Sequence, residues 1–275
     1  MVKVILMGFL LCSLALTNRL HAVVVVTSGT VYNSNEPTTT NIRYWNTGWG
    51  SSSVTGWDYV GTVGGASAVY LGNGWVISAA HVDLSSNTYT LDGVTYTIIA
   101  DSVTTIGNTD LVLFQISTAL DLPTLTISSS SASTGQSVVM IGYGGGTKAW
   151  GTGTINGVNY ELTLDNGHTS TYYYVKYNSI NNTTQAISGD SGGAGFVYNS
   201  TTGQWELSGL LDAIATDDNG GYYTLLIDLS SYSDDINTIV SSVSYIPEPA
   251  CWALLLLGCP IILLLCQRKK HFAAN

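Results

Sequence analysis

A serine framed by glycines is the residue of this 275-residue chain whose setting most favours chemistry. Ser191 lies in the stretch GDSGG at residues 189–193, where glycines leave backbone NH groups open to a substrate carbonyl. A serine hydroxyl is a poor nucleophile unless a base within hydrogen-bond reach takes its proton and a third group orients that base. Ser191 is therefore a candidate nucleophile, and the chain must also supply a histidine and an acid.

The sequence offers one clear base and one favoured acid. Of four histidines, His81 follows an apolar run that ends in small residues, WVISAAH. Asp110 opens the apolar run LVLFQI, which predicts a strand that would bury and fix its carboxylate. Asp83 and Asp101 are alternatives, but Asp83 lies two residues from His81 and Asp101 precedes no comparable strand. The expected triad is His81, Asp110 and Ser191.

The chain order His, Asp, Ser is that of the two-barrel chymotrypsin architecture, rather than of subtilisin or the α/β-hydrolases. Three segments resemble those of a trypsin-like, chymotrypsin-fold serine protease of bacterial type. Residues 74–81 are similar to WVLTAAH, residues 110–116 to DIALLKL, and residues 189–193 are GDSGG. Weaker similarities lie at 141–144, 205–211 and 221–224, within a resemblance that spans about residues 57–243. It implies an all-β fold of two six-stranded antiparallel barrels with a short C-terminal helix.

The resemblance also implies roles for backbone and ion-pair groups. It places the oxyanion hole at the NH groups of Gly189 and Ser191. Asp190 is buried in the family and pairs there with a cation, since a buried unpaired carboxylate is costly. Two partners are candidates here, namely Arg43 and a new amino terminus at Val23, and Arg43 is favoured.

Primary specificity follows from three positions in the resemblance. Gln185, six residues before the nucleophile, stands where tryptic enzymes have an aspartate that selects Arg or Lys, so tryptic specificity is not expected. Residues 212–214 correspond to the pocket wall, where the family usually has Ser-Trp-Gly. Ile214 is expected to narrow the pocket, and Asp212 to attract a cation or cap a turn. Small or uncharged side chains before the scissile bond should fit best.

Both ends of the chain predict export. Residues 1–22 combine Lys3, an apolar stretch and a polar section ending in Ala22, which is typical of a secretory signal peptide. Residues 247–275 contain the motif PEP, an apolar segment at 250–266 and a basic cluster at 268–270. This pattern resembles a PEP-CTERM sorting signal of Gram-negative bacteria. It implies an exosortase-type sorting enzyme as partner, membrane contact through the C-terminal segment, and a cell-surface, outer-membrane or extracellular destination; a plain membrane anchor is the alternative.

Between these ends, residues 23–56 are expected to form an N-terminal arm or a pro-segment, and residues 57–246 the protease domain. All four cysteines lie in the terminal segments, so residues 23–246 contain no disulfide. Three cations against 17 carboxylates leave residues 23–246 a net charge of −14, which disfavours nucleic acid as a partner. No cofactor or metal is expected, because the acidic turns at 165–167 and 217–220 lack the spaced oxygen donors of a calcium loop.

Local patterns predict β structure through most of the domain. Asp92-Gly93 and Asn156-Gly157 each separate two runs rich in Thr, Tyr and Val, which predicts two-residue hairpins at both places. One helix is expected over residues 230–243, capped by Ser231 or Ser233. Its apolar face should carry Ile236, Ile239 and Val240.

The sequence therefore predicts a secreted or surface-sorted serine endopeptidase that acts on protein or peptide substrates through an acyl-enzyme. A catalytically silent protease-fold binding module and a serine esterase on the same scaffold are the alternatives.

Overall fold

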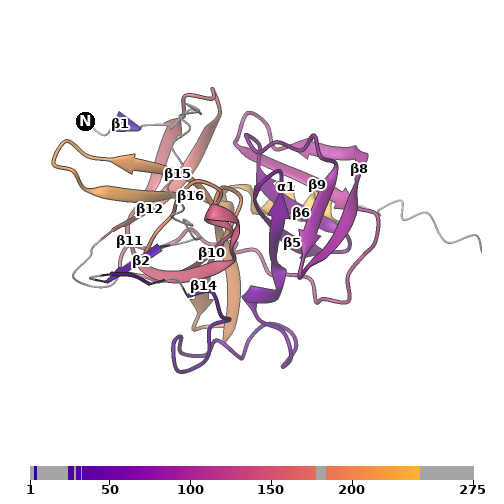
Figure 1. Ribbon diagram of the computed structural model, residues 1–275, viewed down its shortest axis with the longest axis horizontal. Coiled ribbons are helices and arrows are strands. Elements are labelled where there is room, and N and C mark those ends of the chain that lie inside the picture. Colours follow the sequence, from indigo (N-terminus) through magenta and orange to yellow (C-terminus); the bar gives the residue numbers. More distant parts are fainter. Residues whose placement is uncertain (1–2, 5–23, 28, 32, 178–183, 242–275) are drawn as a thin grey trace, which may run out of the picture. The chain divides into compact units, whose positions relative to one another are not determined.

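Two antiparallel β-barrels account for most of the described chain (Figure 1). The computed structural model describes residues 3–4, 24–27, 29–31, 33–177 and 184–241. Within these ranges the predicted all-β fold with two six-stranded barrels and a short C-terminal helix is confirmed. No helix in these ranges has the length and apolarity needed to cross a membrane. Most of the predicted signal peptide, all four cysteines and the predicted sorting segment lie outside the described residues.

The first barrel closes in the order β4-β5-β6-β9-β8-β7. Its strands are β4 (Val60–Val63), β5 (Ala66–Gly72), β6 (Trp75–Ala79), β7 (Thr88–Leu91), β8 (Val94–Thr105) and β9 (Leu111–Ile116). Every residue of β5, β6 and β9 is buried, which explains their continuous apolar runs. Because β6 and β9 pair with Ala79 opposite Leu111, the residues after β6 and before β9 meet at one end of the barrel.

The second barrel contains the strands β10 (Ser137–Gly142), β11 (Ala149–Thr163), β12 (Thr169–Lys176), β14 (Ala194–Asn199), β15 (Gln204–Thr216) and β16 (Tyr222–Asp228). They pair in the order β15-β14-β10-β11-β12-β16, and β16 pairs back with β15 to close the ring. The two-residue strand β1 (Lys3–Val4) adds to β15. A separate small sheet joins β2 (Val24–Thr27) to β3 (Gly29–Val31) and to β13 (Thr184–Gln185).

The hairpin predicted at Asp92-Gly93 is confirmed. Leu91 pairs with Val94 across it, and both turn residues have positive φ, 48° at Asp92 and 75° at Gly93. This backbone is the one that a two-residue turn needs to match the twist of its strands.

The hairpin predicted at Asn156-Gly157 is wrong, because both residues lie inside β11 at a shift in strand register. The side-chain oxygen of Asn156 accepts a hydrogen bond from the Lys176 NH at 2.6 Å. A Cβ atom at Gly157 would lie 2.5 Å from the ring of Tyr174. Asn156-Gly157 therefore forms a β-bulge beside an aromatic ring. Glycine is favoured there because a side chain would clash with that ring, whereas in a turn it is favoured for its backbone conformation. The chain turns instead at the predicted turn 165–167.

The C-terminal helix begins with a 3-10 turn, η3 (Leu229–Tyr232), and continues as α1 (Ser233–Ser241). Asp228 caps this start, since its carboxylate accepts a hydrogen bond from the Ser230 NH at 3.1 Å. The predicted caps Ser231 and Ser233 are therefore wrong, because the last residue of β16 already supplies the acceptor. The predicted apolar face is confirmed: Ile236 and Val240 are buried and Ile239 packs against the same core.

Residues 33–55, part of the predicted arm, pack onto the second barrel. Trp45 is fully buried, and its ring meets those of Trp49, Phe196 and Trp205 at centroid distances of 5.0, 6.3 and 5.1 Å. The first barrel follows through η1 (Gly56–Tyr59). This aromatic cluster makes residues 33–55 part of the folded domain.

Candidate active site

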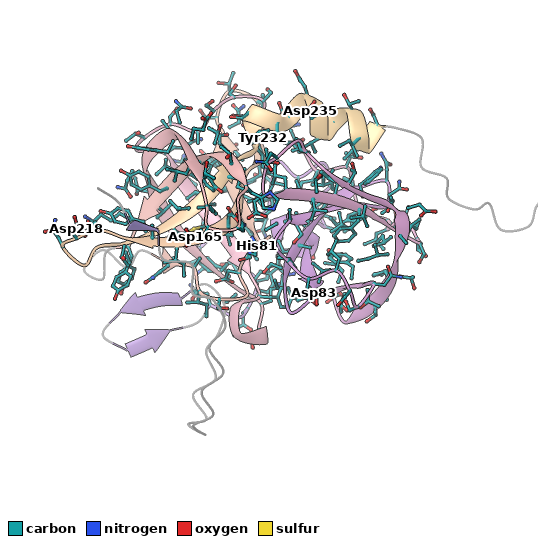
Figure 2. All side chains as sticks on the ribbon, turned by 90° about the horizontal axis from the view of Figure 1, so that it is seen from above. His81, Asp83, Asp165, Asp218, Tyr232 and Asp235 are labelled. Carbon is teal, nitrogen blue, oxygen red and sulfur yellow. The ribbon has the colours of Figure 1, made fainter. Side chains whose placement is uncertain are left out.

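His81 and Asp110 are brought together by the pairing of β6 with β9. The Asp110 carboxylate accepts two hydrogen bonds of 2.8 Å from His81, one from the backbone NH at Oδ1 and one from Nδ1 at Oδ2. The Ala80 NH also donates to the backbone carbonyl of Asp110 at 3.1 Å. In Figure 2 His81 lies where the ribbons of the two barrels adjoin. The Asp110 carboxylate therefore fixes the position of His81 by contacting both its backbone NH and its imidazole ring.

Further contacts from the second barrel hold Asp110. Asn166, in the turn between β11 and β12, donates from Nδ2 to Asp110 Oδ2 at 2.6 Å, and the Asp110 NH donates to Ser170 Oγ at 3.1 Å. Burial alone would raise the pKa of Asp110, but hydrogen bonds from His81 and Asn166 and the charge of His81 lower it below its usual value. Asp110 therefore stays ionised at neutral pH.

The surroundings of His81 favour its protonated form. Burial opposes the charge, but the hydrogen bond to Asp110 and the negative charges of Asp110 and Asp212 outweigh it and raise the pKa of the imidazole. The side chain remains 30% exposed. A group of this kind can take a proton from a nucleophile and return it to a leaving group.

Ser191 lies in a loop between β13 and β14 that is tied to both barrels. Its carbonyl accepts a hydrogen bond from the Ser67 NH at 2.9 Å, and the Gly192 NH donates to the Leu211 carbonyl at 2.7 Å. Ser191 Oγ donates to the backbone carbonyl of Asp212 at 3.3 Å, and no hydrogen bond to His81 is present among the described residues. Catalytic hydrogen bonds are often completed only when substrate binds.

In the GDSGG loop, the backbone NH groups of Gly189 and Ser191 have no hydrogen-bond acceptor within the described part of the chain. The carbonyl of Ser188 accepts from the Gly145 NH at 3.3 Å, and a planar trans peptide then directs the Gly189 NH the opposite way. Gly189 has φ of +95°, which glycine adopts without strain. These are the two NH groups predicted to form the oxyanion hole.

Asp190 is 1% exposed and its carboxylate accepts two backbone hydrogen bonds of 2.8 Å, from Gly144 to Oδ1 and from Ile187 to Oδ2. Arg43, its predicted partner, is exposed and lies over the ring of Tyr44 at 4.5 Å from the centroid. The structure therefore does not bring Arg43 and Asp190 together, because Arg43 belongs to the outer face of residues 33–55.

The three predicted pocket residues occupy different settings. Gln185, in β13, is half-buried and pairs with Val24 of β2. Ile214, in β15, is half-buried and pairs with Thr224 of β16. Asp212 is 7% exposed, and its side chain turns toward the histidine.

Asp212 contacts the site from β15. Its Oδ2 accepts a hydrogen bond from the Tyr172 hydroxyl at 2.6 Å, and its Oδ1 lies 3.4 Å from His81 Nδ1. Within the described residues, the carboxylate of Asp212 thus contacts Tyr172 and His81. Asn166 and Tyr172 were not predicted as site residues, since a turn motif and a strand tyrosine carry no catalytic signal of their own.

One ring nitrogen of His81 and one carboxylate oxygen each of Asp110 and Asp212 lie within 4.8 Å of one another. We attribute this spacing to hydrogen bonding, because His81 Nδ1 already donates to Asp110 and Asp212 Oδ2 already accepts from Tyr172.

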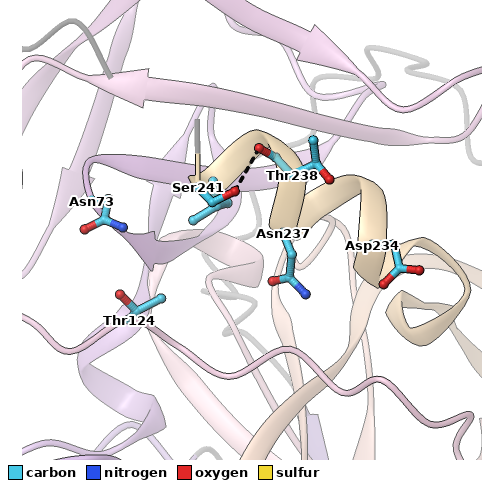
Figure 3. Close-up of a pocket in the computed structure, with 7 residues that line it drawn as sticks. Asn73, Thr124, Asp234, Asn237, Thr238 and Ser241 are labelled. Atoms are coloured by element: carbon cyan, nitrogen blue, oxygen red, sulfur yellow. Dashed lines mark hydrogen bonds between the residues drawn. The ribbon is translucent and has the colours of Figure 1, made fainter. Parts of the chain in front are cut away.

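A shallow groove of about 460 Å³ lies elsewhere, along α1 (Figure 3). It is lined by Asn73, Thr124 and residues of the helix, including Asp234 and Asn237. None of the residues described above for the candidate active site lines it.

Three solved proteases are similar to part of this chain. Among solved structures, the Rv3671c protease of M. tuberculosis in its active form is 16% identical over 66% of this chain and 78% of that chain, with a TM-score of 0.49. The MamO protease domain of Magnetospirillum magneticum is 18% identical over 62% and 87%, with a TM-score of 0.44. The HtrA-type protease AlgW with a decapeptide is 22% identical over 65% and 52%, with a TM-score of 0.47.

No curated protein matches the chain. The trypsin-like peptidase domain family matches residues 65–205, just over half of the chain, and this segment includes His81, Asp110 and Ser191. The chain belongs to the trypsin-like peptidase domain family.

Proposed function

We propose that this protein is a serine endopeptidase in which His81, Asp110 and Ser191 form the catalytic triad. The observation that carries the proposal is the contact of His81 with Asp110 at 2.8 Å, next to a GDSGG loop whose Gly189 and Ser191 NH groups have no acceptor in the described chain. Membership of a peptidase family supports the same reaction class.

The reaction follows from these positions. Ser191 Oγ attacks the peptide carbonyl while its proton passes to Nε2 of His81, and the Nδ1 proton stays hydrogen-bonded to Asp110. The NH groups of Gly189 and Ser191 stabilise the oxyanion, each contributing roughly a hundred- to a thousandfold in rate. His81 then returns the proton to the leaving amine, and water releases the acyl group from Ser191 by the same route.

Hydrolysis of casein by the purified full-length protein tests this proposal. Replacing Ser191 or His81 by Ala should lower kcat at least about a thousandfold, because the two groups act as a unit. Ser85→Ala, at an exposed serine that hydrogen-bonds Asp83, should leave kcat unchanged. Turnover of small esters without casein hydrolysis would favour the esterase, and neither activity in folded protein would favour the silent binding module.

We propose a primary pocket that does not select Arg or Lys. Gln185 carries no charge, and Ile214 adds bulk at the wall position. Peptide-library cleavage by the wild type should therefore favour small or uncharged side chains before the scissile bond.

Gln185→Asp should raise kcat/KM for Arg and Lys substrates by about tenfold or more relative to neutral ones, because an aspartate at the pocket base attracts the cation. Gln185→Asn serves as the uncharged control. An unchanged preference in Gln185→Asp would remove Gln185 from the pocket.

We also propose that the protein is exported and sorted to the cell surface. The support is the sequence of residues 1–22 and 247–275. The expected mature chain begins at Val23 and loses its tail in a Gram-negative host that carries an exosortase. Retention of the tail with the protein in the membrane would favour a plain anchor.

A further inference from the structure

Two carboxyl groups, rather than one, face the imidazole of His81. Asp110, immediately before β9, has Oδ2 2.8 Å from Nδ1, and Asp212, in β15, has Oδ1 3.4 Å from the same nitrogen. Both side chains are completely buried. One acid from each barrel therefore lies beside Nδ1 of His81, whose ring stays partly exposed.

The two acids differ in what stabilises their charge. Asp110 accepts three hydrogen bonds, two from His81 and one from Asn166. Asp212 accepts one, from Tyr172, and its Oδ1 has no hydrogen-bond partner. Two buried carboxylates so close together cannot both ionise at their ordinary pKa values. Asp212, which accepts fewer hydrogen bonds, therefore keeps its proton to higher pH than Asp110 does.

The groups that face Asp212 are His81, which follows β6, Asp110, which precedes β9, and Tyr172 of β12. Burial and the charge of Asp110 raise the pKa of Asp212 to about 7, against the opposing effects of Tyr172 and His81. Burial and the charge of Asp212 raise the pKa of Tyr172, so its hydroxyl keeps its proton and remains a donor.

Resting on the proposed function, we propose that Asp212 is a second acidic partner of the catalytic histidine, a positioning residue whose change between neutral and charged forms sets the proton affinity of His81. With Asp212 protonated, the imidazole faces one negative charge. With Asp212 ionised it faces two, so imidazolium is stabilised both in the resting enzyme and when Ser191 transfers its proton.

The pH dependence of kcat/KM for a peptide substrate tests this role, because the acid limb reports the proton affinity of His81. Asp212→Asn keeps the size of the side chain and an acceptor for Tyr172, but removes the charge. The acid limb should move to lower pH by about one unit, and the plateau should fall by about tenfold as the imidazolium loses stabilisation. Tyr172→Phe, which leaves Asp212 protonated to higher pH, should shift the limb in the same direction by less.

Asp228→Asn is the matched control, because Asp228 is another buried carboxyl with a raised pKa and contacts Ser230, not the site. Its pH profile should equal that of the wild type. An equal shift in this variant would overturn the inference, as would an unchanged profile in an active Asp212→Asn.

NMR titration of the His81 ring in the wild type gives an independent readout should Asp212→Asn fail to fold. Coupling to Asp212 predicts a titration in two steps, whereas a single step would overturn the inference. The proposed function fails separately, through a wild type that hydrolyses no peptide.

Discussion

The candidate site shows that one imidazole is positioned by groups from several strands. His81 and Asp110 come from the first barrel, while Asn166 and Ser170 hold the acid from the second. Asn166 carries the most testable of these supporting contacts, because its 2.6 Å hydrogen bond meets the same oxygen that accepts from His81.

Asn166→Ala should lower the free energy of unfolding at neutral pH by about 1.5–3 kcal/mol, the range for a hydrogen bond to a charged group. The lowered pKa of Asp110 means that its ionised form stabilises the fold above the ordinary carboxyl pKa, and this contribution is lost as the pH falls through the folded-state value. Denaturant unfolding at neutral and strongly acidic pH should therefore show a difference from wild type that narrows in acid.

Asn108→Ala is the control for this measurement. Its side chain donates to the Gly167 carbonyl at 3.2 Å, in the same turn as Asn166, but contacts no carboxylate. Loss of stability that is equal in both variants, or independent of pH, would contradict the role given to Asn166.

At the scale of elements, residues 33–55 show packing that local sequence patterns do not reveal. Residues 23–56 are expected to be an arm or a pro-segment, and in the structure Trp45 and Trp49 of this segment contact Trp205 and Phe196 of the second barrel.

Trp45→Ala should cost about 3–5 kcal/mol in the free energy of unfolding, the range for a buried Trp or Phe. Tyr44→Ala is the neighbouring control: Tyr44 is 40% exposed and stacks on Tyr198 at the surface, so the loss should be much smaller. Thermal unfolding of the two variants would decide the matter, and equal small losses would mean that residues 33–55 are a dispensable arm.

The turns and the helix cap show what local sequence patterns can and cannot reveal. Asp92-Gly93 forms the expected turn because its neighbours pair directly across it. Asn156-Gly157 carries the same turn signal but serves a bulge, since the decisive contact, with Tyr174, comes from another strand. Likewise, the residue that caps the helix is Asp228, which belongs to the preceding strand. Contacts between distant segments decide such cases.

At the scale of the whole molecule, the order of the three motifs predicted the two barrels, and in the structure the predicted pair His81 and Asp110 share a hydrogen bond. The sequence could not show that Asp212 turns to His81 instead of the pocket, because this depends on the hydrogen bond from Tyr172 across the second barrel. Nor could it show that Arg43 stays at the surface while backbone NH groups contact Asp190.

The central claim is that Ser191 is a nucleophile activated by His81, and intact-mass analysis after treatment with a fluorophosphonate tests it most directly. The full-length protein should gain one adduct that maps to Ser191 and is absent in both Ser191→Ala and His81→Ala. Folded wild-type protein that stays unlabelled, or an adduct on another residue, would contradict the account.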